Sequence, residues 1–247
     1  MNAWSNSKDF WNGQVERRVM QKSPTDLDVD RITILAKSIP YRTEAIIWVK
    51  TWEKLSEEVL ISWSEKDIEK YLSDIEVTFQ IFLSQLYSVF GSWRHGHVNL
   101  ELDILKRPDF IERIHPFISR YRRKSDRKNL TIEITERWEP RDVYDAITAN
   151  NLRYLRSQWF RLLVDDYGST MVSRLMLQRY RQIFSWVKIP HELKTSLLQR
   201  GWGQIPLLSM VPPTMEVIAE GAWLMQRRWF LPSRIRWVQD PDHISLD

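Results

Sequence analysis

The sequence predicts a single α/β domain whose eight strands close into a (β/α)8 barrel. The chain has 247 residues, a length at which such barrels commonly form one domain. Hydrophobic residues make up 43% of it, enough for a sizeable core, and the 12% of aromatic residues argues against a disordered chain. Short apolar runs alternate with helical segments, and this alternation is typical of βαβ units around a parallel sheet.

The elements of the barrel can be placed in chain order. Residues 1–30 have weak periodicity and are predicted to form an N-terminal extension or a packing helix, ahead of a barrel domain over 31–247. A helix over about 66–90 is predicted because Leu, Ile and Phe recur there at helical spacing. Because only eight residues follow Gln239, we expect the last barrel helix to be absent or unrecognisable. The expected strands are 31–36, 43–49, 97–102, 130–135, 160–165, 184–189, 215–219 and 235–238, and the other expected helices are 108–123, 141–157, 171–182, 190–199 and 222–229.

The composition excludes several classes of protein. The chain has no cysteine, so disulfides, cysteine zinc sites and a cysteine nucleophile are ruled out. No apolar run reaches the roughly 20 residues of a membrane span, and the N-terminus lacks a secretion signal. We therefore expect a cytoplasmic protein with no membrane partner. The net charge of +4 and the basic run at 120–128 are typical of a solvated surface and a helix end, so nucleic acid is not an expected partner.

Polar residues interrupt nearly every predicted strand or follow its C-terminal end. Because strand side chains alternate faces, Glu133 points into the barrel if Ile132 and Ile134 face the helices. Barrel active sites lie at the C-terminal ends of the strands, and buried carboxylates need neutralising cations. The pattern predicts a cage for a divalent cation, and its oxygen ligands favour Mg²⁺ or Mn²⁺. The residues are Glu44, Asn99, Glu133, Asp165, Asp166, Lys188, Glu220 and Gln239.

Each of these charges has an ordinary structural alternative. Taken singly, any of them could cap a helix or end a strand at the surface, but this is a poor account of the whole series. His95 and His97 fall on one strand face at a spacing that could bind metal. No third ligand accompanies them in the sequence, so a surface strand end is the preferred interpretation.

These residues lie in segments that resemble the EAL family of cyclic di-GMP phosphodiesterases. Residues 43–47 (Thr-Glu-Ala-Ile-Ile) resemble the EAL signature, with Ile46 in place of leucine. Residues 130–136 are similar to the family's LEITE segment, and 164–168 to its DDFG segment. The remaining matches, in the family's order, are 97–100 with VNLS, 187–189 with KID, 217–221 with VAEGVE, and 238–239 with the late glutamine.

The resemblance implies an EAL-type modified barrel that hydrolyses cyclic di-GMP to linear pGpG with a pair of Mg²⁺ or Mn²⁺ ions. It implies that Glu44, Asn99, Glu133 and Asp165 bind one ion, and that Asp165 and Asp166 reach the second. Two such ions can activate a water and stabilise the leaving oxygen of an in-line displacement.

The resemblance also implies roles for four further residues. Lys188 would orient the attacking water or bear on the phosphate, and Glu220 would complete the cage. Glu136 matches the residue that holds the loop after the aspartates, and Gln239 would assist substrate binding at the edge of the site. Homodimers are common in the family, which makes a homodimer one expectation.

Several positions depart from the family pattern. Trp48 stands where the family has a ligand-contacting arginine, and Pro190 and Trp223 replace acidic residues. In the loop 167–174, Thr170 and Met171 replace a glycine and a tyrosine. The alternative is therefore an EAL-like protein that has lost catalysis and acts by binding another protein, or as a cyclic di-GMP sensor. Tryptophans near the end could form a partner surface, although filling the barrel floor is the preferred interpretation. They are Trp223, Trp229 and Trp237.

Overall fold

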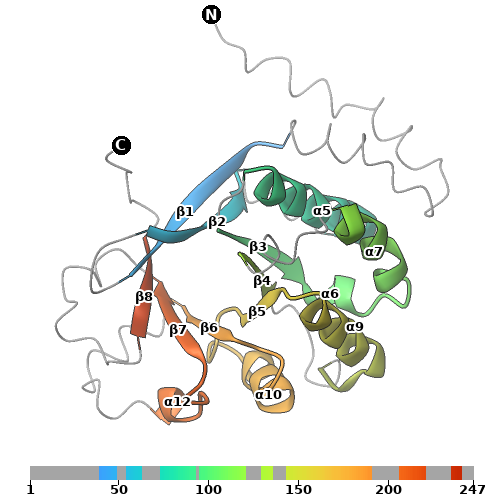
Figure 1. Cartoon of the computed structure of the whole chain (residues 1–247). Coiled ribbons are helices and arrows are strands. Elements are labelled where there is room, and N and C mark those ends of the chain that lie inside the picture. Colours follow the sequence, from blue (N-terminus) through green and yellow to red (C-terminus); the bar gives the residue numbers. More distant parts are fainter. Residues whose placement is uncertain are drawn as a thin grey trace, which may run out of the picture.

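The structure is a computed structural model in which eight strands form a closed barrel in the order β1 to β8 (Figure 1). It describes residues 39–48, 54–62, 73–92, 95–120, 129–135, 143–190, 206–220 and 235–240. The strands are β1 (Tyr41–Trp48), β2 (Lys54–Ile61), β3 (Gly96–Glu101), β4 (Leu130–Thr135), β5 (Arg161–Val164), β6 (Trp186–Ile189), β7 (Glu216–Glu220) and β8 (Ile235–Asp240). The predicted eight-stranded barrel is thus confirmed.

Strand β1 runs antiparallel to both of its neighbours, β2 and β8, while the other neighbouring pairs are parallel. The expectation of a purely parallel sheet was therefore wrong for β1. Only residues 49–53 join β1 to β2, and a parallel connection would need about a dozen residues or more. As a consequence, Tyr41 at the start of β1 lies beside Ile61 at the end of β2, whereas Trp48 pairs with Trp237 towards the opposite end.

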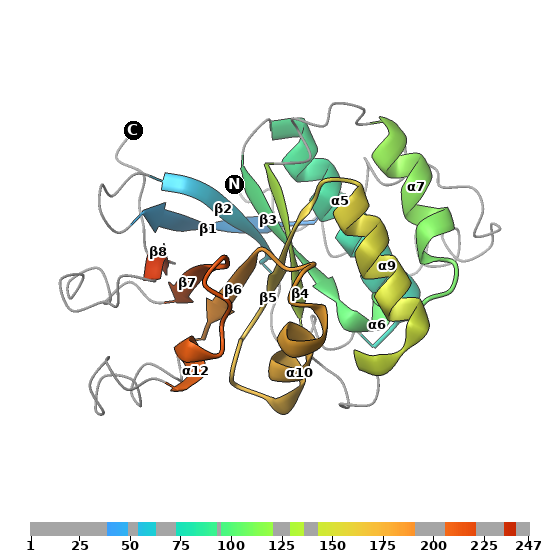
Figure 2. The same ribbon diagram turned by 60° about the horizontal axis from the view of Figure 1, so that its bottom comes forward.

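The helices lie outside this ring of strands. They are α5 (Ile75–Ser92), α6 (Leu102–Leu105), α7 (Phe110–Arg120), α9 (Ala146–Ser157), α10 (Met171–Tyr180) and α12 (Pro206–Ser209). Figure 2 shows α5, α7 and α9 together on one flank of the barrel and α10 at the end of β5. None of the helices in the described ranges is long and apolar enough to cross a membrane.

Local sequence signals explain where several helices begin. Asp74 accepts hydrogen bonds from the backbone N–H groups of Glu76 (2.9 Å) and Val77 (3.3 Å), so the helix predicted over 66–90 starts, within the described residues, at Ile75. Asp145 caps α9 and Thr170 caps α10 in the same way. These caps satisfy N–H groups that have no partner inside the helix.

The other differences from the expected elements concern β2 and segments outside the described residues. Strand β2 was not predicted, because its sequence KLSEEVLI begins with polar residues that mask its alternation. The expected strand 31–36, the helices 190–199 and 222–229, and residues 1–30 fall outside the described residues, as does the chain after 240. The prediction of a missing last helix remains a prediction.

Two apolar layers position the site. The outer faces of the strands pack against the helices, and Val98, Leu100 and Ile132 are fully buried there. Inside the barrel, Ile46, Leu163, Trp186 and Ile218 form a second cluster, against which Trp237 packs. The Trp186 and Trp237 rings are stacked with centroids 5.8 Å apart. Trp237 therefore packs into the barrel floor, as the preferred interpretation expected. The polar groups inside the barrel lie at its other end, which is called the mouth below.

Candidate functional site

The mouth of the barrel gathers polar side chains from strands far apart in the sequence. Alternation along β4 buries Ile132 and Ile134 under the helices and turns Glu133 inward, where it is 0% exposed. The same alternation places Glu58, Asn99 and Lys188 inside the barrel on β2, β3 and β6. Asp165 follows β5 directly, and Glu220 ends β7. Polar groups therefore face one another above the apolar floor.

Lys188 stands at the centre of this group. Its Nζ atom lies 2.5 Å from Glu133 Oε2, 2.9 Å from Asp165 Oδ1 and 3.2 Å from Glu58 Oε2. Glu220 Oε1 lies 3.5 Å from the same atom. The lysine side chain is only 3% exposed, and those of Glu58 and Glu133 are 3% and 0% exposed. One ammonium is thus shared by four carboxylates and cannot neutralise them alone.

The pKa values of these groups are set by burial and by the charges around each group. Burial raises the pKa of Glu133 well above its ordinary value, and the nearby Glu58 carboxylate raises it further. Burial likewise raises the pKa of Asp165. For Lys188, burial acts to lower the pKa, but the surrounding carboxylates outweigh it and raise the pKa well above the ordinary value. For Glu58, burial acts to raise the pKa, but Lys188 and Asn99 outweigh it and lower the pKa.

Amide side chains hold the carboxylates from the side. Asn99 donates from Nδ2 to Glu58 Oε1 at 2.9 Å. Gln239 donates from Nε2 to Glu44 Oε2 and to Glu58 Oε2, both at 2.7 Å. The other amide oxygens, Asn99 Oδ1 and Gln239 Oε1, are buried and have no hydrogen-bond partner among the described residues. Two buried acceptors without donors, beside surplus carboxylates, fit oxygen ligands of a hard divalent cation.

His97 lies beside this group, which the sequence interpretation of a surface strand end did not foresee. Its side chain is 2% exposed, and its Nδ1 atom lies 2.6 Å from Glu133 Oε1. Burial lowers the pKa of His97 to about 3, so the imidazole is neutral at pH 7. A neutral ring can donate one hydrogen bond from Nδ1 to the carboxylate. The interpretation was wrong because the inward face of β3 leads into the barrel and not to solvent.

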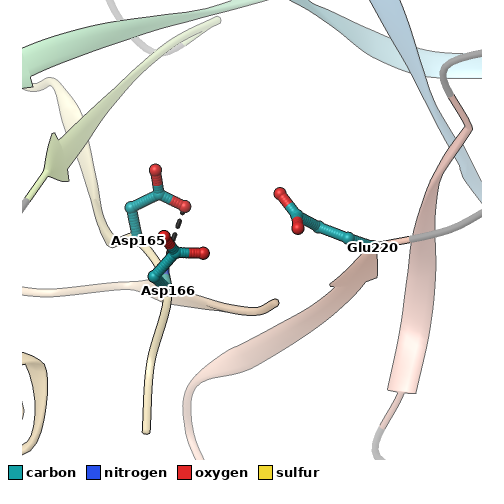
Figure 3. Close-up of side chains that lie close together, drawn as sticks. All are labelled: Asp165, Asp166 and Glu220. Carbon is teal, nitrogen blue, oxygen red and sulfur yellow. Dashed lines mark hydrogen bonds between the residues drawn. The ribbon is translucent and has the colours of Figure 1, made fainter. Parts of the chain in front are cut away.

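A second carboxylate group lies at the rim. Asp165 and Asp166 face Glu220 across the mouth (Figure 3), and each offers an oxygen atom within 4.8 Å of the others. Asp165 Oδ1 accepts a hydrogen bond of 2.9 Å from the backbone N–H of Asp166, whose φ of 45° is in the left-handed region. This strained turn separates two adjacent aspartates so that both carboxylates remain near the mouth.

Glu58 is the principal residue that the sequence reasoning missed. It lies opposite Glu44 in the β1–β2 ladder, but only Glu58 contacts Lys188 and Asn99 among the contacts seen for the two. The segment Glu58-Val59-Leu60 differs from Glu-Ala-Leu at one position, as does Glu44-Ala45-Ile46. Glu58 is therefore as near a match to the signature as Glu44, and this similarity is the local signal that could have found it.

The two alignments place different residues at the family's arginine position. Counting from Glu44 gives Trp48, and counting from Glu58 gives Ser62. Trp48 lies at the end of β1 away from the mouth, so the expectation that it replaces a ligand-contacting residue was wrong. Neither alignment supplies an arginine. Glu136, the remaining predicted residue, lies outside the described residues.

A hollow of about 370 Å³ opens beside the carboxylates. Its lining includes Asn99, Asp165 and Asp166, and also Arg42 from the start of β1. The hollow joins the polar mouth to apolar side chains of α5 such as Phe82. A ligand with both charged and flat apolar parts would find partners for each in it.

No protein-family model and no curated protein matches this sequence. Solved structures do match. The EAL enzyme Bd1971, in its cAMP- and cyclic-di-GMP-bound form, is 18% identical with a TM-score of 0.63, and the match covers 91% of this chain and 67% of that one. An EAL domain protein from Listeria monocytogenes EGD-e is 16% identical with a TM-score of 0.60, over 90% of this chain and 92% of that one.

A third match is BlrP1 of Klebsiella pneumoniae in a calcium and cyclic-di-GMP complex. It is 17% identical with a TM-score of 0.59, and the match covers 92% of this chain and 68% of that one. A manganese complex of the same protein also matches. The likeness extends over nearly the whole chain while sequence identity stays below a fifth. This chain therefore has the EAL-domain fold, at 16–18% sequence identity to these three structures.

Proposed function

We propose that this protein binds cyclic di-GMP together with two divalent cations, Mg²⁺ or Mn²⁺, and hydrolyses it to linear pGpG. The observation that carries the proposal is the excess of carboxylate over cation among the described residues of the mouth: four carboxylates, two of them buried, share Lys188, beside two amide oxygens that find no hydrogen-bond partner among those residues. Similar folds were solved with cyclic di-GMP bound, and one of them with calcium or manganese.

The contacts in the barrel mouth indicate a set of metal ligands that differs from the expected set at one residue. One cation would be held by Glu58, Asn99, Glu133 and Asp165. We infer Glu58 in place of Glu44, because Glu58 shares Lys188 with Glu133 and accepts from Asn99. Among the described residues, Glu44 reaches the group only through Gln239. The second cation would be held by Asp165, Asp166 and Glu220, whose oxygens lie within 4.8 Å of one another.

The bound cations would lower the pKa of a coordinated water. They would also supply positive charge that stabilises the leaving oxygen. The chain's own residues position these parts. The carboxylates stabilise the charged form of Lys188, and cations bound to those carboxylates would free its ammonium to hold a water or a phosphate oxygen. Gln239 bridges Glu44 and Glu58 by donating to both. The apolar floor below excludes bulk water from the underside of the site.

The second candidate function is a non-catalytic regulator that binds another protein or senses cyclic di-GMP. The observation favouring it is the missing arginine, since both Trp48 and Ser62 lack a guanidinium. The loop after the aspartates is also built differently. Thr170 there caps α10 instead of providing glycine flexibility, and Met171 is 64% exposed.

Calorimetry with cyclic di-GMP, followed by chromatography for pGpG, tests the proposal. The wild-type protein in Mn²⁺ is expected to bind and to form product, and Glu133→Gln and Asp165→Ala to form none. Glu58→Gln should abolish product more completely than Glu44→Gln. Glu216→Gln serves as the control, because Glu216 pairs with the exposed Arg236 at the other end of the barrel. Binding without product would favour the sensor. If neither binding heat nor product is detected, cyclic di-GMP is ruled out as the ligand.

A further inference from the structure

The hollow beside the carboxylates has one cationic wall. Among the described residues that line it, Arg42 is the single cationic side chain, and Asn99, Asp165 and Asp166 line the same hollow. Its side chain is 62% exposed, so the guanidinium is open to solvent. The only ion pair seen for it among the described residues, to Glu44 Oε1, is 3.4 Å long. An exposed pair of this kind contributes little stability and can be exchanged for a ligand.

The reversed direction of β1 places Arg42 at the mouth. In the β1–β2 ladder Arg42 pairs with Leu60, one residue before the C-terminal end of β2. That end of β2 lies at the mouth of the barrel. In a parallel β1 the same residue would lie at the floor. Arg42 and Glu44 share one face of the strand, so the guanidinium lies above the carboxylate group and not behind the sheet.

An anionic ligand needs such a residue here. The mouth is rich in carboxylates, and the Lys188 ammonium is occupied by them. A phosphodiester entering the site would meet mostly negative groups apart from bound cations. A guanidinium offers two parallel N–H donors that match two phosphate oxygens, which an ammonium or a hydroxyl cannot do.

We propose that Arg42 is the phosphate-binding residue of this hollow and that it supplies, from β1, the guanidinium absent at Trp48 and Ser62. The ligand class is a phosphodiester or diphosphate. The inference rests on the proposed function for its preferred ligand, cyclic di-GMP. Arg42 leaves Glu44 and contacts a phosphate group, while the nucleobases lie along the apolar side of the hollow that includes Phe82.

The test is calorimetric binding of cyclic di-GMP in Ca²⁺, with pyrophosphate as a second probe. Arg42→Ala is expected to weaken binding of both probes roughly 10- to 100-fold, which is about 1.4–2.8 kcal/mol. Arg42→Lys should recover only part of the loss, because it keeps the charge and loses the paired donors. Binding of Ca²⁺ alone should change less than about twofold, since the ion pair seen for Arg42 among the described residues is with Glu44, which is not one of the proposed metal ligands.

Arg236→Ala is the matched control, because Arg236 is 60% exposed and also pairs with one glutamate, but lies on β8 next to the floor. If Arg42→Ala binds both probes as the wild type does, the inference is overturned while the proposed function stands. If the wild type binds pyrophosphate through Arg42 but not cyclic di-GMP, the inference holds and the proposed substrate fails. If the wild type binds neither probe, both are overturned.

Discussion

Replacing Lys188 with methionine would remove the one ammonium that four carboxylates share. Methionine has a similar length and fills the same space, so the change is chiefly the loss of charge and not the creation of a cavity. In protein freed of divalent cations, Glu58, Glu133 and Asp165 would then repel one another without a counterion. This repulsion is expected to destabilise the folded state and not the unfolded state, because water hydrates all of these groups in the unfolded chain.

The size of the effect follows from burial. Lys188 is 3% exposed, and its two closest glutamates are no more exposed than that. Removing one partner of a buried ionic group typically costs about 3–5 kcal/mol. Part of this loss is recovered when Glu133 takes up a proton, because its pKa is already raised by burial. We therefore expect the free energy of unfolding to fall by roughly 3 kcal/mol.

The assay is urea unfolding at about pH 7.5 in the presence of EDTA, followed by tryptophan fluorescence and circular dichroism. Glu133→Gln is the companion variant, because it removes a negative charge from the same group without changing its volume. It should lose less than about 1 kcal/mol or gain stability, since the ionised form is disfavoured at that site. A loss below about 1 kcal/mol for Lys188→Met, or an equal loss for both variants, would refute the charge argument.

Three further outcomes are expected. Adding Mn²⁺ at 100 times its dissociation constant should stabilise the wild type by about 2.7 kcal/mol and leave Glu58→Ala nearly unchanged, as thermal unfolding would show; equal stabilisation of both would remove Glu58 from the ligand set. Changing His97 to phenylalanine should leave Glu133 Oε1 without its 2.6 Å partner and weaken Mn²⁺ binding about 10- to 100-fold, whereas His97→Asn should restore the binding because asparagine keeps a donor. Unchanged affinity in His97→Phe would make His97 a packing residue. Burial raises the pKa of Tyr41 to about 12, so its contribution to stability is present below pH 10 and lost as the pH rises towards 12, by on the order of 1–2 kcal/mol relative to Tyr41→Phe; parallel pH curves for the two proteins would contradict this.

The strand register explains why much of the site could be predicted. Glu133 lies between Ile132 and Ile134, and in a two-residue repeat this spacing leaves the carboxylate on the inner face whatever the rest of the chain does. The same local alternation accounts for Asn99 and Lys188. The positions of Asp165 and Glu220 follow from the rule that the active sites of parallel barrels lie at the C-terminal ends of the strands.

Glu58 and His97 could not be found in this way. Glu58 stands in a strand whose polar start hides its alternation, and its importance comes from Asn99 and Lys188, which are 41 and 130 residues away along the chain. His97 is made neutral by burial, and burial is a property of packed neighbours such as Trp186, whose ring lies 6.1 Å away. Neither contact distance nor desolvation is contained in a local pattern.

The sequence by itself determined the alternation of strands and helices, the barrel, and the inward position of most of the acidic residues, because these depend on periodicities of two and 3.6 residues. The tertiary structure alone decided the direction of β1, and with it which residues reach the mouth. Reversal of that one strand carries Trp48 to the floor end and Arg42 to the rim. The physical reason is that a five-residue connection permits only an antiparallel return, while the closure of the barrel makes β8 the second partner of the same strand.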